Sequence, residues 1–487
     1  METQLFAGWG EADITPDDTV VELSGQYYQR LSRGIHSRLK ATVLLLEQEG
    51  NCTILVSLDN VGIPEEFVEQ LQNAAARKIP QLSSAKLILN ATHTHCEPDL
   101  TGRLGWWENS QQAITTAEYR TIVEERLLEA IAAAWGSRRP CGVANVLDYA
   151  RVGHSRRAVY ANGTAEMYGR TDRPDFTCME SGEDSGLDLL FFFDQQKQPV
   201  GVVVNVACPS QVMEATYLVS SDFMGALREK LKIEFGPHFS TLCQVGAAGC
   251  QSPRDLTRNY KGEPDCWHAD GVAVLSDRLF DAVRRAYARA VTTVEYDLIF
   301  SHSTQQISLP VRKVSPTEWQ SAQQELERLL AIQDEAKAFA DFCRIVHENE
   351  RIEGLHGPYD SKLHHFVLIK NQQAVIRRYE DQKAAPDYAM RLHVIRIGKT
   401  AIAFNPFELF LDYGQRIKAQ SCADQTFVVQ LANGIAGYLP TARAEQMGGY
   451  GGLVINGQVS SQGGDQLVTL TVTAIRRLWR NEASSPI

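Results

Sequence analysis

The stretch "LILNATHTHCEPDL", Leu87 to Leu100, decides how this sequence is interpreted. Its first residues form an apolar run of strand-favouring side chains that ends at Asn90. The polar residues His93, His95 and Cys96 follow within a few positions. This pattern predicts a buried strand with a polar loop at its end. Loops at strand ends are where α/β sheets commonly build their sites.

Strand and helix patterns alternate on both sides of this stretch. Residues 41–59 predict a hairpin of two apolar strands, and residues 65–78 and 117–135 have helical spacing. Residues 199–210 and 241–253 each read as a strand followed by a loop. The alternation predicts an α/β fold: a layered mixed-sheet core flanked by helices, with the active site in loops at strand ends.

The chain of 487 residues has no internal repeat and no low-complexity segment, so we expect a single domain over residues 1–487. Residues 317–350 have a long helical pattern covered mostly by Glu, Gln and Lys. That pattern predicts a solvent-exposed helical arm or a pair of packed helices.

Charge and hydropathy limit the classes of partner that the chain can bind. With 48 Lys and Arg against 59 Asp and Glu, the net charge is −11, and no basic cluster interrupts it. Nucleic-acid binding depends on such clusters, so we expect no nucleic-acid partner. No segment reaches the roughly 18 apolar residues of a transmembrane span, and the N-terminal residues lack the pattern of a signal peptide. We therefore expect a cytoplasmic protein without a transmembrane segment.

The two histidines of the opening stretch are two positions apart. In an extended segment, alternation would point His93 and His95 to the same face, so that one metal ion or one substrate meets both. An HxH pattern alone fits a metal or catalytic site and equally fits two hydrogen-bonded or surface histidines. A metal site needs further ligands from elsewhere in the chain.

Three other residues stand at strand ends. Glu408 is a carboxylate in the apolar stretch "FNPFELF", where it needs a cation or strong donors. Cys208 ends a buried strand and is either a thiolate ligand for zinc or inert packing, like most of the ten cysteines, which form no CxxC pair. Ser252 lies in a loop of small residues but not in a G-x-S-x-G motif, so this lone serine is not evidence for a serine hydrolase.

Together these blocks make the chain resemble the neutral ceramidase family, the neutral/alkaline non-lysosomal ceramidases and their bacterial relatives. The resemblance covers most of residues 7–455, and its blocks occur in the family's order. They are "AGWGEADITP", "GIHSRLKATVLLLE", "VSLDNVGI", "NATHTHCEPD", "LVSSDFMG", "GAAGCQSP", "NPFELF" and "LANGIAGYLPT" followed by "GGY".

The resemblance implies a zinc amidase, because the family's enzymes cleave the amide of ceramide into sphingosine and a fatty acid. It places zinc on His93 and Glu408. Cys208 falls where the family has its second zinc histidine, and Ile435 falls where it has a tyrosine ligand. A site of His93, Cys208 and Glu408 with one Zn²⁺ per chain and an open position for water is therefore expected. The alternative is a metal site that has shifted, weakened or been lost.

The resemblance also assigns roles around the metal. With Glu408 as a ligand, His95 is the candidate for proton transfer or oxyanion support. Arg156 or Arg157 matches a family arginine near the substrate, and Ser252 and Tyr450 match further pocket positions. Each of these also has an ordinary structural interpretation, since such residues are common on surfaces and in loops.

The leading prediction is a metal-dependent hydrolase that cleaves the amide of an N-acylsphingosine-like lipid or of another N-acyl substrate. The family's additional C-terminal β-sandwich domain is not expected here, and a smaller polar substrate is a second candidate. A metal enzyme acting on carbohydrate, using His36, Arg38 and Asp59, and a non-catalytic ligand-binding member are the alternatives. The sequence leaves open whether the chain forms a homo-oligomer.

Overall fold

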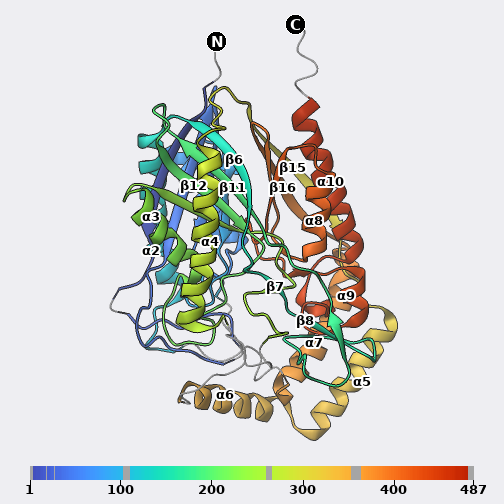
Figure 1. Cartoon of the computed structure of the whole chain (residues 1–487). Coiled ribbons are helices and arrows are strands. Elements are labelled where there is room, and N and C mark those ends of the chain that lie inside the picture. The colour runs from blue at the N-terminus through green and yellow to red at the C-terminus, as the bar shows by residue number, and fades with distance from the viewer. Residues whose placement is uncertain are drawn as a thin grey trace.

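The computed structural model describes residues 4–17, 19–26, 28–102, 110–258, 266–351 and 363–480. They form the mixed α/β fold that the alternation predicts, with sheets inside and helices outside. Figure 1 shows α3 and α4 on one side of the molecule and α8 and α10 on the opposite side. The fold class expected from the sequence is therefore confirmed.

The first sheet holds the opening stretch, with strand order β4-β3-β2-β1-β5. β4 pairs in parallel with β3, and the hairpin expected from residues 41–59 is formed by β2 and β3. Its elements are β1 Phe6–Asp13, β2 Lys40–Gln48, β3 Asn51–Leu58, α1 Glu65–Lys78, η1 Ser84–Lys86, β4 Leu87–Ala91, α2 Thr116–Ser137 and β5 Arg139–Pro140.

The second and third sheets each contain one parallel pair, β12 with β13 and β17 with β19. The second sheet comprises β6 Gly142–Tyr149, β11 Gly186–Phe193, β12 Pro199–Val206 and β13 Ser240–Val245, with α3 Asp222–Phe235 and α4 His268–Ala290. The third comprises β15 Phe300–Pro310, β16 Asp387–Ile397, β17 Thr400–Phe404 and β19 Gln425–Val429, with α8 Leu411–Gln420 and α10 Ser461–Arg480.

The inner faces of the three sheets share one apolar core. On β2, Leu44 and Leu46 belong to this central core, whereas Val43 and Leu45 on the other face belong to the core formed with α1 and α2. Alternating side chains thus fill both faces, which explains the unbroken apolar run of β2. The layers hold the strand ends in fixed positions.

Short elements lie beyond the strand ends of the three sheets. They are β7 His154–Ser155, β8 Arg157–Tyr160, β9 Ala165–Met167, β10 Phe176–Met179, β14 Gln251–Ser252, β18 Glu408–Leu409, β20 Tyr438–Leu439, α9 Ala442–Met447 and η3 Val454–Asn456. β7 pairs with β14, and β18 pairs with β20. These pairs bring loops from distant parts of the sequence together.

The segment expected to be a helical arm contains α5 Pro316–Ile332 and α6 Glu335–Arg351, and α7 His365–Ala384 packs against both. We call these three helices the arm; they lie at the bottom of the view in Figure 1. A Ser315–Glu318 capping box starts α5. Across the described ranges, no helix is both long and apolar enough to cross a membrane.

Candidate active site

The site lies where parallel strands end. His93 follows β4, Gln211 follows β12, Gly249 follows β13, and Glu408 follows β17. Loops after the carboxyl ends of neighbouring parallel strands converge on one edge, and here they bring together a cluster of mostly buried polar side chains, which we call the pocket. This convergence is the structural reason why polar residues follow so many of the buried strands.

The two histidines of the HxH pattern face each other. Their Nε2 atoms are 3.5 Å apart and their ring centroids 4.9 Å apart, with the rings edge to face. The loop is not extended as the alternation argument assumed, because His93 has a φ of 65°, in the left-handed region. The His93 amide donates to Asn60 O at 2.9 Å, which holds this uncommon conformation.

The ring of His93 is oriented by the backbone. Its Nδ1 lies 2.6 Å from Val61 O, so Nδ1 carries the proton and Nε2 presents its lone pair. That Nε2 lies 3.8 Å from Glu408 Oε2. Burial lowers the pKa of His93, although the Glu408 carboxylate acts in the opposite direction. The imidazole therefore faces the pocket mainly in its neutral form.

The tautomer of His95 is set by Gln211, a residue that the sequence argument missed. Arg156 Nη1 donates to Gln211 Oε1 at 3.1 Å, and since arginine only donates, the amide oxygen must face it. The Gln211 amide nitrogen then donates to His95 Nε2 at 2.8 Å. The His95 proton is consequently on Nδ1, which lies 3.5 Å from Glu214 Oε2. Burial and the neighbouring His93 lower the pKa of His95 well below its usual value.

Arg156 is the buried cation of the pocket. Its guanidinium donates to Gly249 O at 2.9 Å and to the Tyr438 hydroxyl at 3.3 Å, and Nη2 lies 3.5 Å from Glu408 Oε2. The Tyr168 hydroxyl lies 3.5 Å from Nη1. Only 1% of Arg156 is exposed. The sequence had offered Arg156 and Arg157 equally, and the structure places Arg156 beside Glu408.

Arg157 points to other partners. Its guanidinium contacts the Glu180 carboxylate and donates to Tyr450 O and Gly448 O, both at 2.7 Å. Arg157 therefore anchors the loop that carries Tyr450. The Tyr450 ring packs edge to face on Tyr438, with centroids 5.6 Å apart, so it adjoins the pocket through that ring.

Ser252 is fully buried in β14 and accepts a hydrogen bond from Arg254 N at 3.1 Å. Burial raises the pKa of Tyr168, and a hydrogen bond with Ser252 opposes that shift. Ser252 thus contacts the pocket through Tyr168.

Glu214 is a second residue that the sequence argument missed. It is fully buried beside His95, and burial raises the pKa of its carboxyl to about 7. Gln26 Nε2 donates to Glu214 O at 3.1 Å. Gln211 and Glu214 both follow β12, so the strand-to-loop pattern that pointed to Cys208 was the available signal for them.

The three expected zinc donors do not assemble. Cys208 is buried, its thiol donates to Val152 O at 3.3 Å, and burial raises the thiol pKa well above its usual value. Zinc binds the thiolate, which this environment disfavours. No group of three or more His, Cys, Asp or Glu side chains able to hold a metal ion occurs among the described residues. His93 and Glu408 form a two-donor pair, and the residues present do not fit the expected centre.

Ile435 stands at the position where the resemblance implies a tyrosine ligand. A Cβ on Gly62 would lie 2.7 Å from Ile435 Cδ1, so the isoleucine packs over Gly62, next to the Val61 carbonyl that holds His93. The side chain is 42% exposed. It supplies an apolar contact at the rim and no donor atom.

The residues considered for a carbohydrate substrate make other contacts. Asp59 forms a two-pronged ion pair with Arg228, both distances being 3.0 Å, and both side chains are buried. Arg38 pairs with Asp13 and Asp17 on the surface, and His36 Nδ1 lies 3.3 Å from Ser220 Oγ. Asp59 is therefore structural.

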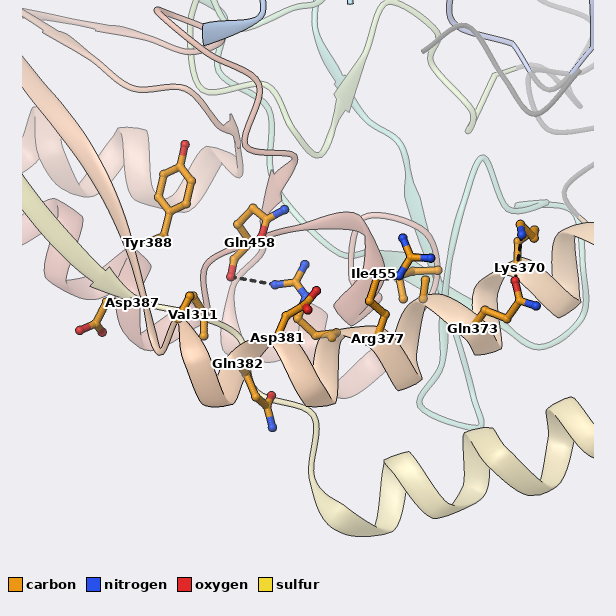
Figure 2. A pocket seen from close by; sticks show the side chains of 13 residues that line it. Val311, Lys370, Gln373, Arg377, Asp381, Gln382, Asp387, Tyr388, Ile455 and Gln458 are labelled. Atoms are coloured by element: carbon orange, nitrogen blue, oxygen red, sulfur yellow. Dashed lines mark hydrogen bonds between the residues drawn. The ribbon is translucent and has the colours of Figure 1, made fainter. Parts of the chain in front are cut away.

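A separate hollow of about 480 Å³ lies between α7 and the start of β16. Figure 2 shows its lining, which includes Arg377 and Asp381 of α7 and Tyr388 of β16. Arg378, also in the lining, donates to Gly457 O at 2.9 Å and so fastens α7 to the neighbouring loop. None of the site residues predicted from the sequence lines this hollow.

The three sheets around a common core form a fold that is also found in solved neutral ceramidase structures. The structure is similar to neutral ceramidase from Pseudomonas aeruginosa, with a TM-score of 0.69 and 17% identity over 98% of this chain and 75% of that chain. A structure described as ceramidase complexed with C2 matches with a TM-score of 0.70 and 16% identity, over 98% of this chain and 76% of that one. The resemblance is thus confirmed for the fold. No protein-family model matches the chain, and no curated protein does.

Proposed function

We propose that this chain is a hydrolase that cleaves the amide bond of an N-acyl compound in the pocket of His93, His95, Arg156 and Glu408. The observation that carries the proposal is their convergence from three separate segments, on a fold shared with neutral ceramidases. A buried cluster of imidazoles, carboxylate and guanidinium is the kind of arrangement that tunes proton transfer.

The geometry favours His93 as the general base. Its Nε2 lone pair faces the pocket, whereas the corresponding atom of His95 already accepts from Gln211. His93 would take a proton from water as the water oxygen bonds to the carbonyl carbon. The Glu408 carboxylate, 3.8 Å away, would stabilise the imidazolium. The proton would pass to the leaving nitrogen as the C–N bond breaks, giving a carboxylic acid and an amine.

Zinc, which the resemblance implies, has no step in this proposal because the described donors do not form the expected centre. An N-acylsphingosine-like lipid and a smaller N-acyl compound both remain within the proposed substrate class. Ile435, exposed at the rim, supports an apolar acyl chain on that side. The cytoplasmic location and the single-domain organisation stay predictions.

The test is the release of amine from a panel of N-acylsphingosines, N-acyl amino acids and N-acetyl sugars. We expect turnover with one class and loss of turnover in His93→Ala. His36→Ala is the matched control, since His36 is exposed and outside the pocket, and it should retain activity. Absence of amine release from every class would contradict the proposal.

The second candidate is a non-catalytic protein that binds such a ligand in the same pocket. The observation in its favour is the unsuitability of Cys208 and Ile435 as donors. Calorimetric binding of an N-acyl compound without its cleavage, abolished in His93→Ala, would support this candidate.

A further inference from the structure

The charge balance of the pocket depends on Arg156. A partly buried carboxylate such as Glu408, whose side chain is 15% exposed, favours a positive partner, which in a zinc centre is the metal ion. Here Arg156 Nη2 lies 3.5 Å from Glu408 Oε2 and carries a permanent charge. The role of counter-charge is therefore filled by a side chain.

Arg156 is also fixed in place from several directions. Its hydrogen bonds go to Gly249 O, to Gln211 Oε1 and to the Tyr438 hydroxyl. Its guanidinium carbon lies 5.8 Å from the Tyr168 ring centroid and 5.9 Å from that of Tyr438, within the range of cation–π attraction. Such a surrounded guanidinium cannot swing aside to make room for a second cation without breaking these contacts.

The position for a third metal donor is closed as well. From the loop after β12, Gln211 enters the pocket, whereas the Cys208 thiol turns to Val152 O. The Gln211 amide uses its oxygen on Arg156 and its nitrogen on His95, so the His95 Nε2 lone pair is engaged too. Among the His, Cys, Asp and Glu side chains that the structure describes, only the pair of His93 and Glu408 remains, and the neighbouring Tyr438 hydroxyl is engaged by Arg156. Catalytic zinc commonly uses three protein ligands.

We propose that Arg156 is the resident cation of this site and that the pocket works without a bound metal ion, with Gln211 coupling Arg156 to His95. The inference deepens the proposed function and rests on it for its kinetic test. It differs from what the resemblance implies about zinc.

The first experiment measures zinc in the purified, untagged protein, prepared without chelator and again after incubation with zinc chloride and gel filtration. We expect far less than one zinc per chain in both samples. If an N-acyl compound is cleaved, its turnover should be unaffected by a strong chelator. About one zinc per chain in wild type, lost in His93→Ala and Glu408→Gln, would overturn the inference.

The second experiment replaces the cation. Arg156→Met should lower kcat by about 100-fold, in line with the loss of one preorganised charged group, and added guanidinium should restore part of it. Arg157→Met is the matched control, because Arg157 is a buried neighbour that anchors the Tyr450 loop. This variant should be less stable than wild type, and added guanidinium should not restore its kcat. If Arg156→Met does not fold, the zinc content and the chelator response of wild type still decide whether the site works without a metal ion.

The outcomes separate the two proposals. Turnover of an N-acyl compound by protein holding one zinc per chain overturns the metal-free site and leaves the proposed function standing. Zinc-free protein that cleaves no member of the panel contradicts the hydrolase and supports only the assignment of Arg156 as the resident cation.

Discussion

Gly25 lies against the imidazole of His95, and replacing it with alanine tests how tightly the pocket is built. A Cβ at this position would lie 2.1 Å from His95 Nδ1 and 2.5 Å from its Cγ, closer than real Cβ atoms approach. The ring must then move by about 1 Å, and a misplacement of that size can lower a rate about 100-fold. We expect Gly25→Ala to lose kcat on this scale.

Backbone strain contributes separately to the loss of stability. Gly25 has a φ of 90°, where an alanine costs about 1–2 kcal/mol, and overpacking against the ring adds about 1–3 kcal/mol. Gly163 has a φ of 81° with nothing within 4 Å of the added Cβ, so Gly163→Ala carries the strain without the contact. The free energy of unfolding in urea and kcat are compared between the two variants. Equal losses of stability and of kcat in Gly25→Ala and Gly163→Ala would refute the reasoning.

Three further predictions concern buried polar groups. Burial raises the pKa of Glu214 from 4.5 to about 7, so the folded state holds this proton more tightly than the unfolded state, and stability falls as pH rises from about 4.5 to 7. The free energy of unfolding of Glu214→Gln relative to wild type should therefore be up to about 3 kcal/mol higher at pH 8 than at pH 4.5, as measured by urea unfolding. A difference between the two proteins that does not change with pH would contradict this. Asp59→Ala should cost about 3–5 kcal/mol because it leaves the buried Arg228 unpaired, whereas a loss below 1 kcal/mol would show that the pair matters little. Cys208→Ala should cost about 1–2 kcal/mol as a small cavity and leave kcat and metal content unchanged, and a large loss of kcat would return Cys208 to the reacting centre.

The fold could be predicted because its signals are local. Apolar runs ending in polar loops marked β4, β12 and β13, since strands buried on both faces by neighbouring layers need continuous apolar sequence. The arm was only partly anticipated. The helical pattern of residues 317–350 covers α5 and α6, but α7 follows a separate segment that the sequence argument did not single out.

The site was harder to predict because its contacts join distant loops. Counting residues from a motif selected Cys208, but which residue of a loop enters a pocket depends on its backbone turns, and here it is Gln211. The Arg156–Gln211–His95 chain spans three segments, so no spacing in the sequence could reveal it. The left-handed backbone of His93 is likewise held by Asn60, a partner outside the motif.

The arm shares its apolar core with two tyrosines of the main body. Tyr28 is fully buried in that core and Tyr217 packs against it, and their loops also carry Gln26 and Glu214, which meet beside His95. Loosening the arm would therefore propagate into these loops and appear as faster hydrogen exchange of their amides. Substitutions in the arm could therefore change how long these two loops stay ordered. Turnover could change in this way without any change to a residue of the site.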